Sequence, residues 1–129
     1  MKINLSSVDI ADIEKSLKTQ LPDEIKEQYK ISNGLLGPTD CQFLYTYKVN
    51  ENTDLIRINK ILKSEEWFPN KFIQSIFIGD DGCGNLIGYD SSNNKAFTWN
   101  PSDGDEIQEE RKTIKEVWCY IENLYIDES

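Results

Sequence analysis

The sequence contains no histidine and only three cysteines in 129 residues. Without histidine, the chain cannot assemble a Ser–His or Cys–His nucleophile and lacks a principal zinc ligand. Cys41, Cys83 and Cys119 lie far apart and form no C-x-x-C pair, which argues against a zinc ribbon and a thioredoxin-like redox site. We therefore expect reduced thiols packed in or near the core.

Long apolar runs are also absent. No run approaches the ~20 residues that a membrane-spanning helix needs. Residues 1–9 have neither a long apolar core nor a small-residue cleavage site, so they do not resemble a signal peptide. We expect a cytoplasmic protein with no membrane partner, folded as a single domain over residues 1–129.

Basic residues are outnumbered, with 14 Lys and Arg against 23 Asp and Glu, so the formal net charge is −9. Direct nucleic-acid binding normally needs clustered Lys and Arg, which this balance disfavours. Residues 101–129 alone carry nine acids and three bases. Such an acidic end can steer a basic partner, or it can simply keep the protein soluble.

Helical patterns occupy the first part of the chain. A helix is predicted after Ser6 or Ser7, with a loose capping box between Ser6 and Asp9. A second helix starts at Leu21-Pro22 and is expected to end at Asn33-Gly34, where either residue can take a left-handed cap conformation. Residues 55–67 are ambiguous: they favour helix or irregular structure, with a short strand at their start as the alternative.

Four segments have strand patterns. Residues 41–49 alternate apolar and polar side chains with period two. Strands at about 75–79, 85–90 and 95–99 recur at roughly ten-residue spacing, which is typical of an antiparallel meander. Gly79, Gly82 and Gly84 surround the first turn, where glycine permits backbone angles that a side chain forbids.

The chain closes with a loop at 100–105 and an amphipathic helix that begins at the capping box Thr113–Glu116. The apolar stripe of this helix consists of Ile114, Val117, Trp118, Ile121, Leu124 and Tyr125. Together the elements predict an α+β fold. Its mostly antiparallel sheet contains a meander at about 75–99 and is packed by N-terminal helices and the C-terminal amphipathic helix.

These landmarks together resemble the SUKH superfamily, which includes the yeast Smi/Knr cell-wall regulators and many small bacterial immunity proteins. The resemblance covers about residues 20–125, although Cys83 stands where glycine or another small residue is common. It implies an α+β domain without catalysis and, for a short bacterial member, an immunity role: binding a cognate toxin, often a nuclease. The motif residues that it implies to be structural are Leu21, Pro22, Asn33, Gly34, Gly79, Gly82, Gly84 and Asp90.

The acidic turn that follows the strand at about 75–79 has less support as a metal, phosphate or catalytic site. Asp80, Asp81, Asn85 and Asp90 offer oxygen ligands to a metal, but their spacing does not match an EF-hand loop. The glycines form no G-x-G-x-x-G fingerprint, and no helix follows them to bind phosphate. We expect no cofactor. Carboxylates are numerous enough that a carboxylate-based hydrolase stays open as an alternative. However, nothing in the sequence places two of them ~5–10 Å apart across a cleft.

Acidic and aromatic residues are the candidates for a partner-binding surface. Carboxylates can cover the basic cleft of a nuclease and raise the association rate, and exposed aromatic residues can anchor such a contact. The alternatives are a core position for Trp99 and a mobile loop for the acidic segment 103–110. The candidates are Asp80, Asp81, Asn85, Trp67, Phe68, Trp99, Asp103, Asp105, Glu106, Glu109 and Glu110. The predicted function is neutralisation of a cognate toxin, and a regulatory or scaffolding module is the alternative.

Overall fold

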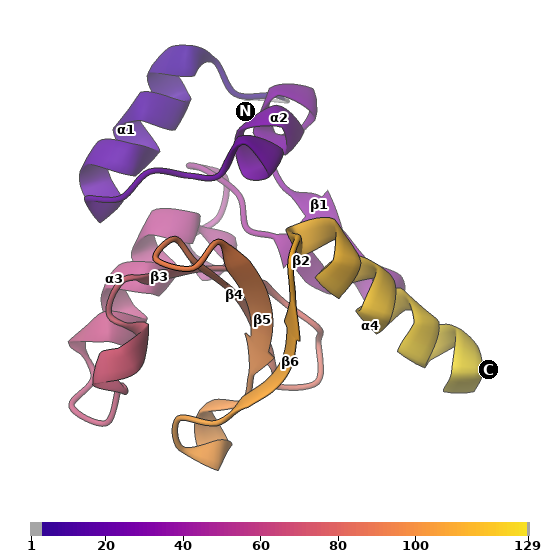
Figure 1. Ribbon diagram of the computed structural model, residues 1–129. Helices are drawn as coiled ribbons and strands as arrows, with labels where there is room; N and C mark the ends of the chain where they lie inside the picture. The colour runs from indigo at the N-terminus through magenta and orange to yellow at the C-terminus, as the bar shows by residue number, and fades with distance from the viewer. Residues whose placement is uncertain (1–3, 129) are drawn as a thin grey trace.

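The computed structural model describes residues 4–128, except for the side chains of 127 and 128 (Figure 1). Residues 1–3 and 129, which belong to the predicted domain, lie outside the described residues. The helices are α1 (Ser7–Leu17), α2 (Asp23–Ile31), α3 (Leu55–Ser64) and α4 (Ile114–Glu128). The strands are β1 (Leu35–Leu36), β2 (Gln42–Leu44), β3 (Ser75–Asp80), β4 (Leu86–Asp90), β5 (Lys95–Trp99) and β6 (Ile107–Arg111). This arrangement confirms the predicted α+β class.

The predicted meander is confirmed and carries one further strand. β3, β4 and β5 pair antiparallel in chain order, and β6 pairs with the outer side of β5. The sequence pattern does not predict β6, because Glu109, Glu110 and Arg111 make up most of it and charged residues are depleted in strands. Pairing with β5 imposes the extended conformation on this segment.

The long strand predicted over residues 41–49 is wrong beyond Leu44, where β2 ends. The backbone N–H of Tyr45 still donates to the Ile78 carbonyl of β3 at 2.7 Å. Further along, Lys48 takes a left-handed φ of 55°, which a continuous strand does not contain. The apolar face of the pattern is buried at Cys41, Phe43, Tyr45 and Tyr47, but Leu44 of the other face is also buried and Val49 is exposed.

Hydrophobic side chains cover both faces of the four-stranded sheet. Neighbouring residues of a strand point to opposite faces, so Ile76 and Ile78 belong to one cluster and Phe77 to another. The first cluster joins the sheet to α1, α2, β2 and α4. The second is aromatic and consists of Phe68, Phe72, Phe77, Phe97 and Trp99.

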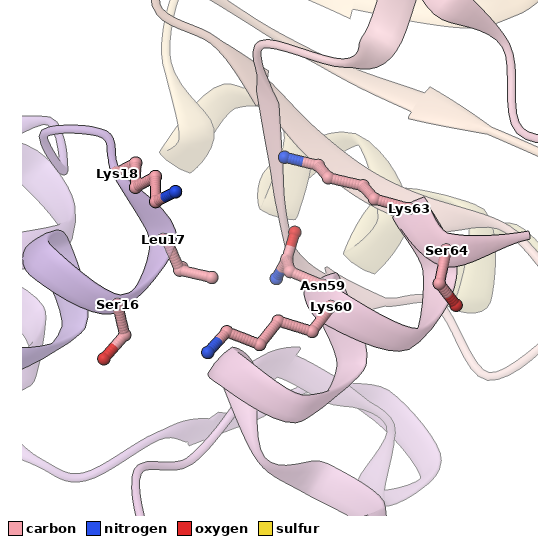
Figure 2. Close-up of a pocket in the computed structure, with 7 residues that line it drawn as sticks. All are labelled: Ser16, Leu17, Lys18, Asn59, Lys60, Lys63 and Ser64. Carbon is pink, nitrogen blue, oxygen red and sulfur yellow. The ribbon is translucent and has the colours of Figure 1, made fainter.

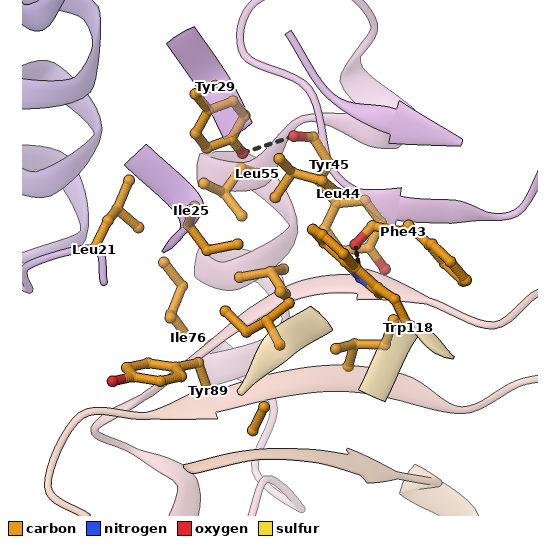
Figure 3. Close-up of a cluster of buried hydrophobic side chains, with 14 of the residues drawn as sticks. Leu21, Ile25, Tyr29, Phe43, Leu44, Tyr45, Leu55, Ile76, Tyr89 and Trp118 are labelled. Carbon is orange, nitrogen blue, oxygen red and sulfur yellow. Dashed lines mark hydrogen bonds between the residues drawn. The ribbon is translucent and has the colours of Figure 1, made fainter. Parts of the chain in front are cut away.

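Two buried hydrogen bonds tie the helices to the backbone around β2 (Figure 3). The Tyr29 hydroxyl of α2 donates to the Tyr45 carbonyl at 2.7 Å, and Trp118 Nε1 of α4 donates to the Phe43 carbonyl at 3.0 Å. The Trp118 ring also stacks on Phe43, with ring centroids 5.8 Å apart. These contacts explain why so short a strand is fixed in place.

The capping box at the start of α1 is confirmed. Ser6 N donates to Asp9 Oδ2 at 2.9 Å, and Asp9 N donates to Ser6 Oγ at 3.3 Å. For residues 55–67 the helical alternative is correct, and α3 starts after Asp54, whose side chain accepts from Arg57 N at 3.0 Å. Both helices therefore begin at a side chain that satisfies a free backbone N–H group.

The end of α2 differs from the prediction. The helix stops at Ile31, and Ser32 after it is extended rather than left-handed. Gly34 does adopt a positive φ of 104°, but in the turn that leads into β1. Asn33 acts through its side chain, which accepts from Tyr47 N at 2.7 Å and donates to Tyr47 O at 2.9 Å.

The start of α4 is capped from two directions. Thr113 Oγ1 accepts from Glu116 N at 3.1 Å, as the predicted capping box requires. The Glu24 carboxylate of α2 accepts from the backbone N–H groups of Ile114 and Lys115 at 2.8 and 3.0 Å. A residue 90 positions away in the chain thus fixes where α4 begins.

Candidate partner-binding site

Asp81 organises the turn between β3 and β4. Its side chain is 7% exposed and accepts from Cys83 N at 2.8 Å, Asn85 N at 3.1 Å and Asn85 Nδ2 at 2.6 Å. Asn85 Oδ1 is buried and has no hydrogen-bond partner among the described residues. The turn is therefore held rigid by a carboxylate that faces inward.

Asp80 also uses its oxygens within the fold. It accepts from Gly82 N at 3.0 Å and from the Tyr45 hydroxyl at 3.1 Å. Burial and the neighbouring Asp80 carboxylate raise the pKa of Tyr45, so the phenol stays neutral and donates. Gly82 and Gly84 have φ of 78° and 95°, the left-handed region that favours glycine.

The other motif residues make contacts inside the fold. A Cβ added to Gly79 would collide with the backbone carbonyls of Gln42 and Phe43, so glycine lets β2 approach β3 closely. Asp90 accepts from the N–H and the hydroxyl of Ser92 at 2.9 and 2.6 Å and shapes the β4–β5 turn. Gly79 therefore sets the approach of β2 to β3, and Asp90 sets the β4–β5 turn.

Strand pairing brings the two acidic turns to the same end of the sheet. Leu86 lies opposite Asp80 on one side and Trp99 on the other. Trp99 in turn lies opposite Ile107, where β6 begins. The β3–β4 turn and the β5–β6 connection therefore leave the sheet from one row of residues (Figure 1).

The β5–β6 connection, residues 100–106, forms what we call the acidic loop. Trp99 Nε1 donates to the Gly104 carbonyl at 2.9 Å, which ties the loop to the sheet. Asp103, Asp105 and Glu106 are exposed, and within residues 4–128 none of them forms an ion pair. This loop therefore presents three uncompensated negative charges.

Glu109 and Glu110 differ from the acidic loop, because both are paired within β6 and its neighbours. Glu109 lies 2.7 Å from Arg111 Nη1, and the Arg111 guanidinium lies over the Tyr120 ring, 5.0 Å from its centroid. Glu110 lies 3.3 Å from Lys95 Nζ of β5. Their charges are therefore partly offset by bases of the same chain.

The three aromatic candidates separate into core and surface. Phe68 and Trp99 are buried in the aromatic cluster, with ring centroids 5.9 Å apart in an edge-to-face arrangement. Because neither ring is exposed, neither can anchor a contact with a partner. Trp67 is 54% exposed and is therefore available as an anchor.

Trp67 lines an open groove of about 350 Å³ along α3, which the sequence does not predict. Leu86 forms one wall, so the groove lies at the same end of the sheet as the acidic loop. Ile61, 47% exposed on α3, is the signal that marks this surface. The α3 groove is lined by the apolar residues Ile58, Ile61, Leu62, Trp67 and Leu86 and by the polar residues Glu51, Asn52, Arg57 and Glu65.

The cysteine prediction holds for one residue of three. Cys41 is buried, whereas Cys83 and Cys119 are exposed, and all three are free thiols. Cys83 belongs to the projecting β3–β4 turn, and Cys119 lies between the buried Trp118 and Ile121 on the outward side of α4. Position on a turn and on a helix face therefore outweighs the usual tendency of cysteine to be buried.

The structure separates Asp90 from the other oxygen ligands considered for a metal, whereas Asp80, Asp81 and Asn85 lie together in the β3–β4 turn. Asp90 lies opposite Ser75 and Asp80 opposite Leu86, which places the two carboxylates at opposite ends of β4. Within residues 4–128, no group of three or more Cys, Asp or Glu side chains is arranged to hold a metal ion. No helix in this part of the chain has the length and apolar character to cross a membrane.

The family model described as SMI1 / KNR4 family (SUKH-1) matches residues 4–120. The chain belongs to the SMI1/KNR4 family. A search of curated proteins found no match. The SUKH-1 match covers the whole four-stranded sheet, both acidic turns and the α3 groove. Membership places the chain among immunity and regulatory proteins, which generally act by binding proteins rather than by catalysis.

Proposed function

We propose that this protein is a cytoplasmic immunity protein that binds a cognate bacterial toxin in a stoichiometric complex and blocks it. It acts without a cofactor and without catalysis. Family membership supports protein binding as its mode of action. The observation that carries the proposal is the acidic loop, with three exposed carboxylates that form no ion pair among the described residues, at the same end of the sheet as the exposed Trp67 of the α3 groove.

The two surfaces favour a partner of defined chemistry. Unpaired carboxylates attract a basic surface such as the phosphate-binding cleft of a nuclease and increase the association rate. The Trp67 ring offers apolar area that can enter a pocket on the partner, as tryptophan at interface hot spots does. The hydrogen bond from Trp99 to Gly104 and the bonds around Asp81 keep the surface preorganised.

Co-expression with the product of the neighbouring candidate toxin gene tests this proposal. We expect restored growth and a complex that co-purifies in a one-to-one ratio. A toxin that kills equally well with and without this protein, and that does not co-purify with it, would contradict the proposal. Turnover of a small molecule by the purified protein alone would contradict the absence of catalysis.

Charge-neutralising variants locate the contact. The variant Asp103→Asn/Asp105→Asn/Glu106→Gln should lower the association rate roughly tenfold at low salt and weaken its salt dependence. The control Glu27→Gln/Glu116→Gln/Glu122→Gln changes the net charge equally at exposed positions elsewhere. Equal rates for the two variants would show that only overall charge matters and that the acidic loop is not the contact.

A regulatory module that binds a cellular protein is the second candidate, because the SMI1/KNR4 family also includes regulators. It predicts a chromosomal neighbourhood without a toxin gene. It also predicts that the acidic loop and Trp67 are needed for binding a housekeeping partner, and that no toxic activity is suppressed.

A further inference from the structure

A pocket between α1 and α3 is lined by basic side chains and no acidic ones. Its volume is about 280 Å³, and its lining contains Lys18, Lys60 and Lys63. Figure 2 shows Lys18 and Lys63 extending toward each other across the gap, with Lys60 reaching from α3 toward α1. Leu17 points into the same space. We call this site the lysine pocket.

The three ammonium groups have no carboxylate partner among the side chains that the structure describes. Among the side chains of residues 4–126, no carboxylate oxygen lies within 4.0 Å of Lys18, Lys60 or Lys63 Nζ. Elsewhere among the described residues five bases pair with acids, at Lys26, Lys48, Arg57, Lys95 and Arg111, and five lysines do not, at Lys15, Lys30, Lys71, Lys112 and Lys115. The lysine pocket differs from these other positions because three such ammonium groups line one concave site that contains no acid, in a protein with a net charge of −9.

The negative ends of the two helix dipoles offset only part of the positive charge of the lysine pocket. Lys18 is the C-cap of α1, and Lys63 lies in the last turn of α3, where cations are favoured. The C-terminus of each helix contributes roughly −0.5 of an elementary charge. Three ammonium groups near two such termini leave a local excess of roughly +2. Burial also lowers the pKa of Lys63, which shows the cost of holding its charge there without a partner.

We propose that the lysine pocket binds a small phosphate-bearing ligand, with Lys18, Lys60 and Lys63 contacting its dianionic phosphate group. A dianion matches the uncompensated charge, and the stems of the lysines together with Leu17 can cover an attached organic group. The pocket lies on the opposite side of α3 from the α3 groove, since Asn59, Lys60 and Lys63 share one side of the helix and Ile58, Ile61 and Leu62 share the other. Ligand and partner can therefore be bound together.

Titrations monitored by backbone amide NMR test the site. The probes are inorganic phosphate, a phosphate monoester such as glycerol phosphate, and sulfate, with chloride at the same ionic strength as the reference. We expect saturable shifts at residues 16–18 and 59–64 with phosphate, monoester and sulfate, but not with chloride. Tighter binding of the monoester would assign the site to an organic phosphate, and equal binding would assign it to free phosphate.

Matched variants distinguish a built site from general attraction. Lys60→Gln/Lys63→Gln should weaken phosphate binding about tenfold or more, because two charge-assisted contacts are lost. Lys30→Gln/Lys112→Gln changes the net charge equally at exposed lysines outside the pocket and should leave the affinity unchanged. Circular dichroism checks that both variants fold. Shifts that do not saturate, or equal weakening by both variants, would overturn the proposal.

Discussion

The two acidic turns at one end of the sheet use the same residue types in opposite ways. In the β3–β4 turn, Asp81 faces inward and accepts three hydrogen bonds. In the acidic loop, Asp103 and Asp105 face solvent, and the loop is held instead by the bond from Trp99 to Gly104. Acidic composition therefore does not by itself indicate a binding surface. Only the carboxylates without an internal partner are available to one.

Removing the inward carboxylate should have the largest effect on stability. Asp81→Ala leaves the Cys83 and Asn85 N–H groups without an acceptor, so we expect a loss of about 3 kcal/mol in the free energy of unfolding. Asp103→Ala should change it by less than about 0.5 kcal/mol, as for an ordinary surface position. Urea denaturation of both variants measures the difference. Equal losses would show that the two turns do not differ as described.

Alkaline pH should weaken the hydrogen bond from the Tyr45 hydroxyl to Asp80 at the start of the β3–β4 turn. The pKa of Tyr45 is raised in the folded protein by burial and then by Asp80. Because the folded pKa lies above the unfolded one, the unfolded state loses its proton first, and stability falls as pH rises above about 10. Tyr45→Phe should flatten this fall in urea denaturation measured between about pH 8 and 11. Tyr29, whose pKa burial also raises, should contribute to the remaining slope, together with the other tyrosines whose pKa is raised, Tyr47, Tyr89, Tyr120 and Tyr125.

The acidic loop should depend on the tryptophan beneath it. Trp99→Phe removes the donor to the Gly104 carbonyl and leaves a small void in the aromatic cluster, so we expect a loss of about 1–2 kcal/mol. Amide hydrogen exchange should become faster at residues 100–106 and stay unchanged at residues 81–85. Equal acceleration in both turns would mean that they are held as one unit.

Neutralising the paired acids of β6 should have the smallest effect. Glu109 and Glu110 form partly exposed ion pairs with Arg111 and Lys95, and such pairs contribute about 0–1 kcal/mol. Glu109→Gln/Glu110→Gln should shift the free energy of unfolding by less than about 1 kcal/mol. If the acidic loop is the contact, this variant should also slow association with the partner less than neutralising the loop does.

Sequence patterns predict the parts of this fold that local chemistry determines. The meander follows from apolar runs separated by turn residues, and α4 follows from its apolar period and the Thr113 cap. β6 is missed because pairing with β5, rather than strand propensity, makes Glu109 and Glu110 extended. The strand over 41–49 is overestimated because Tyr47 is buried in the hydrophobic core without lying in a strand, and its hydroxyl donates to Asp12.

The candidate sites also differ in how far the sequence predicts them. The acidic loop is visible in the sequence as a run of acids, but which carboxylates turn inward depends on backbone N–H groups that only the folded turn presents. The α3 groove and the lysine pocket cannot be predicted from any one segment. Residues 16–18 and 59–64 form the pocket only after α1 has packed beside α3.

The cap that Glu24 provides for α4 has a consequence during synthesis. A nascent chain that has not yet reached Ile114 has no N–H groups for this carboxylate, and the Phe43 carbonyl still lacks the Trp118 indole. The N-terminal half therefore cannot complete its packing while the last helix is inside the ribosome. We expect stalled or prematurely terminated chains to stay loosely folded and to be degraded by cellular proteases.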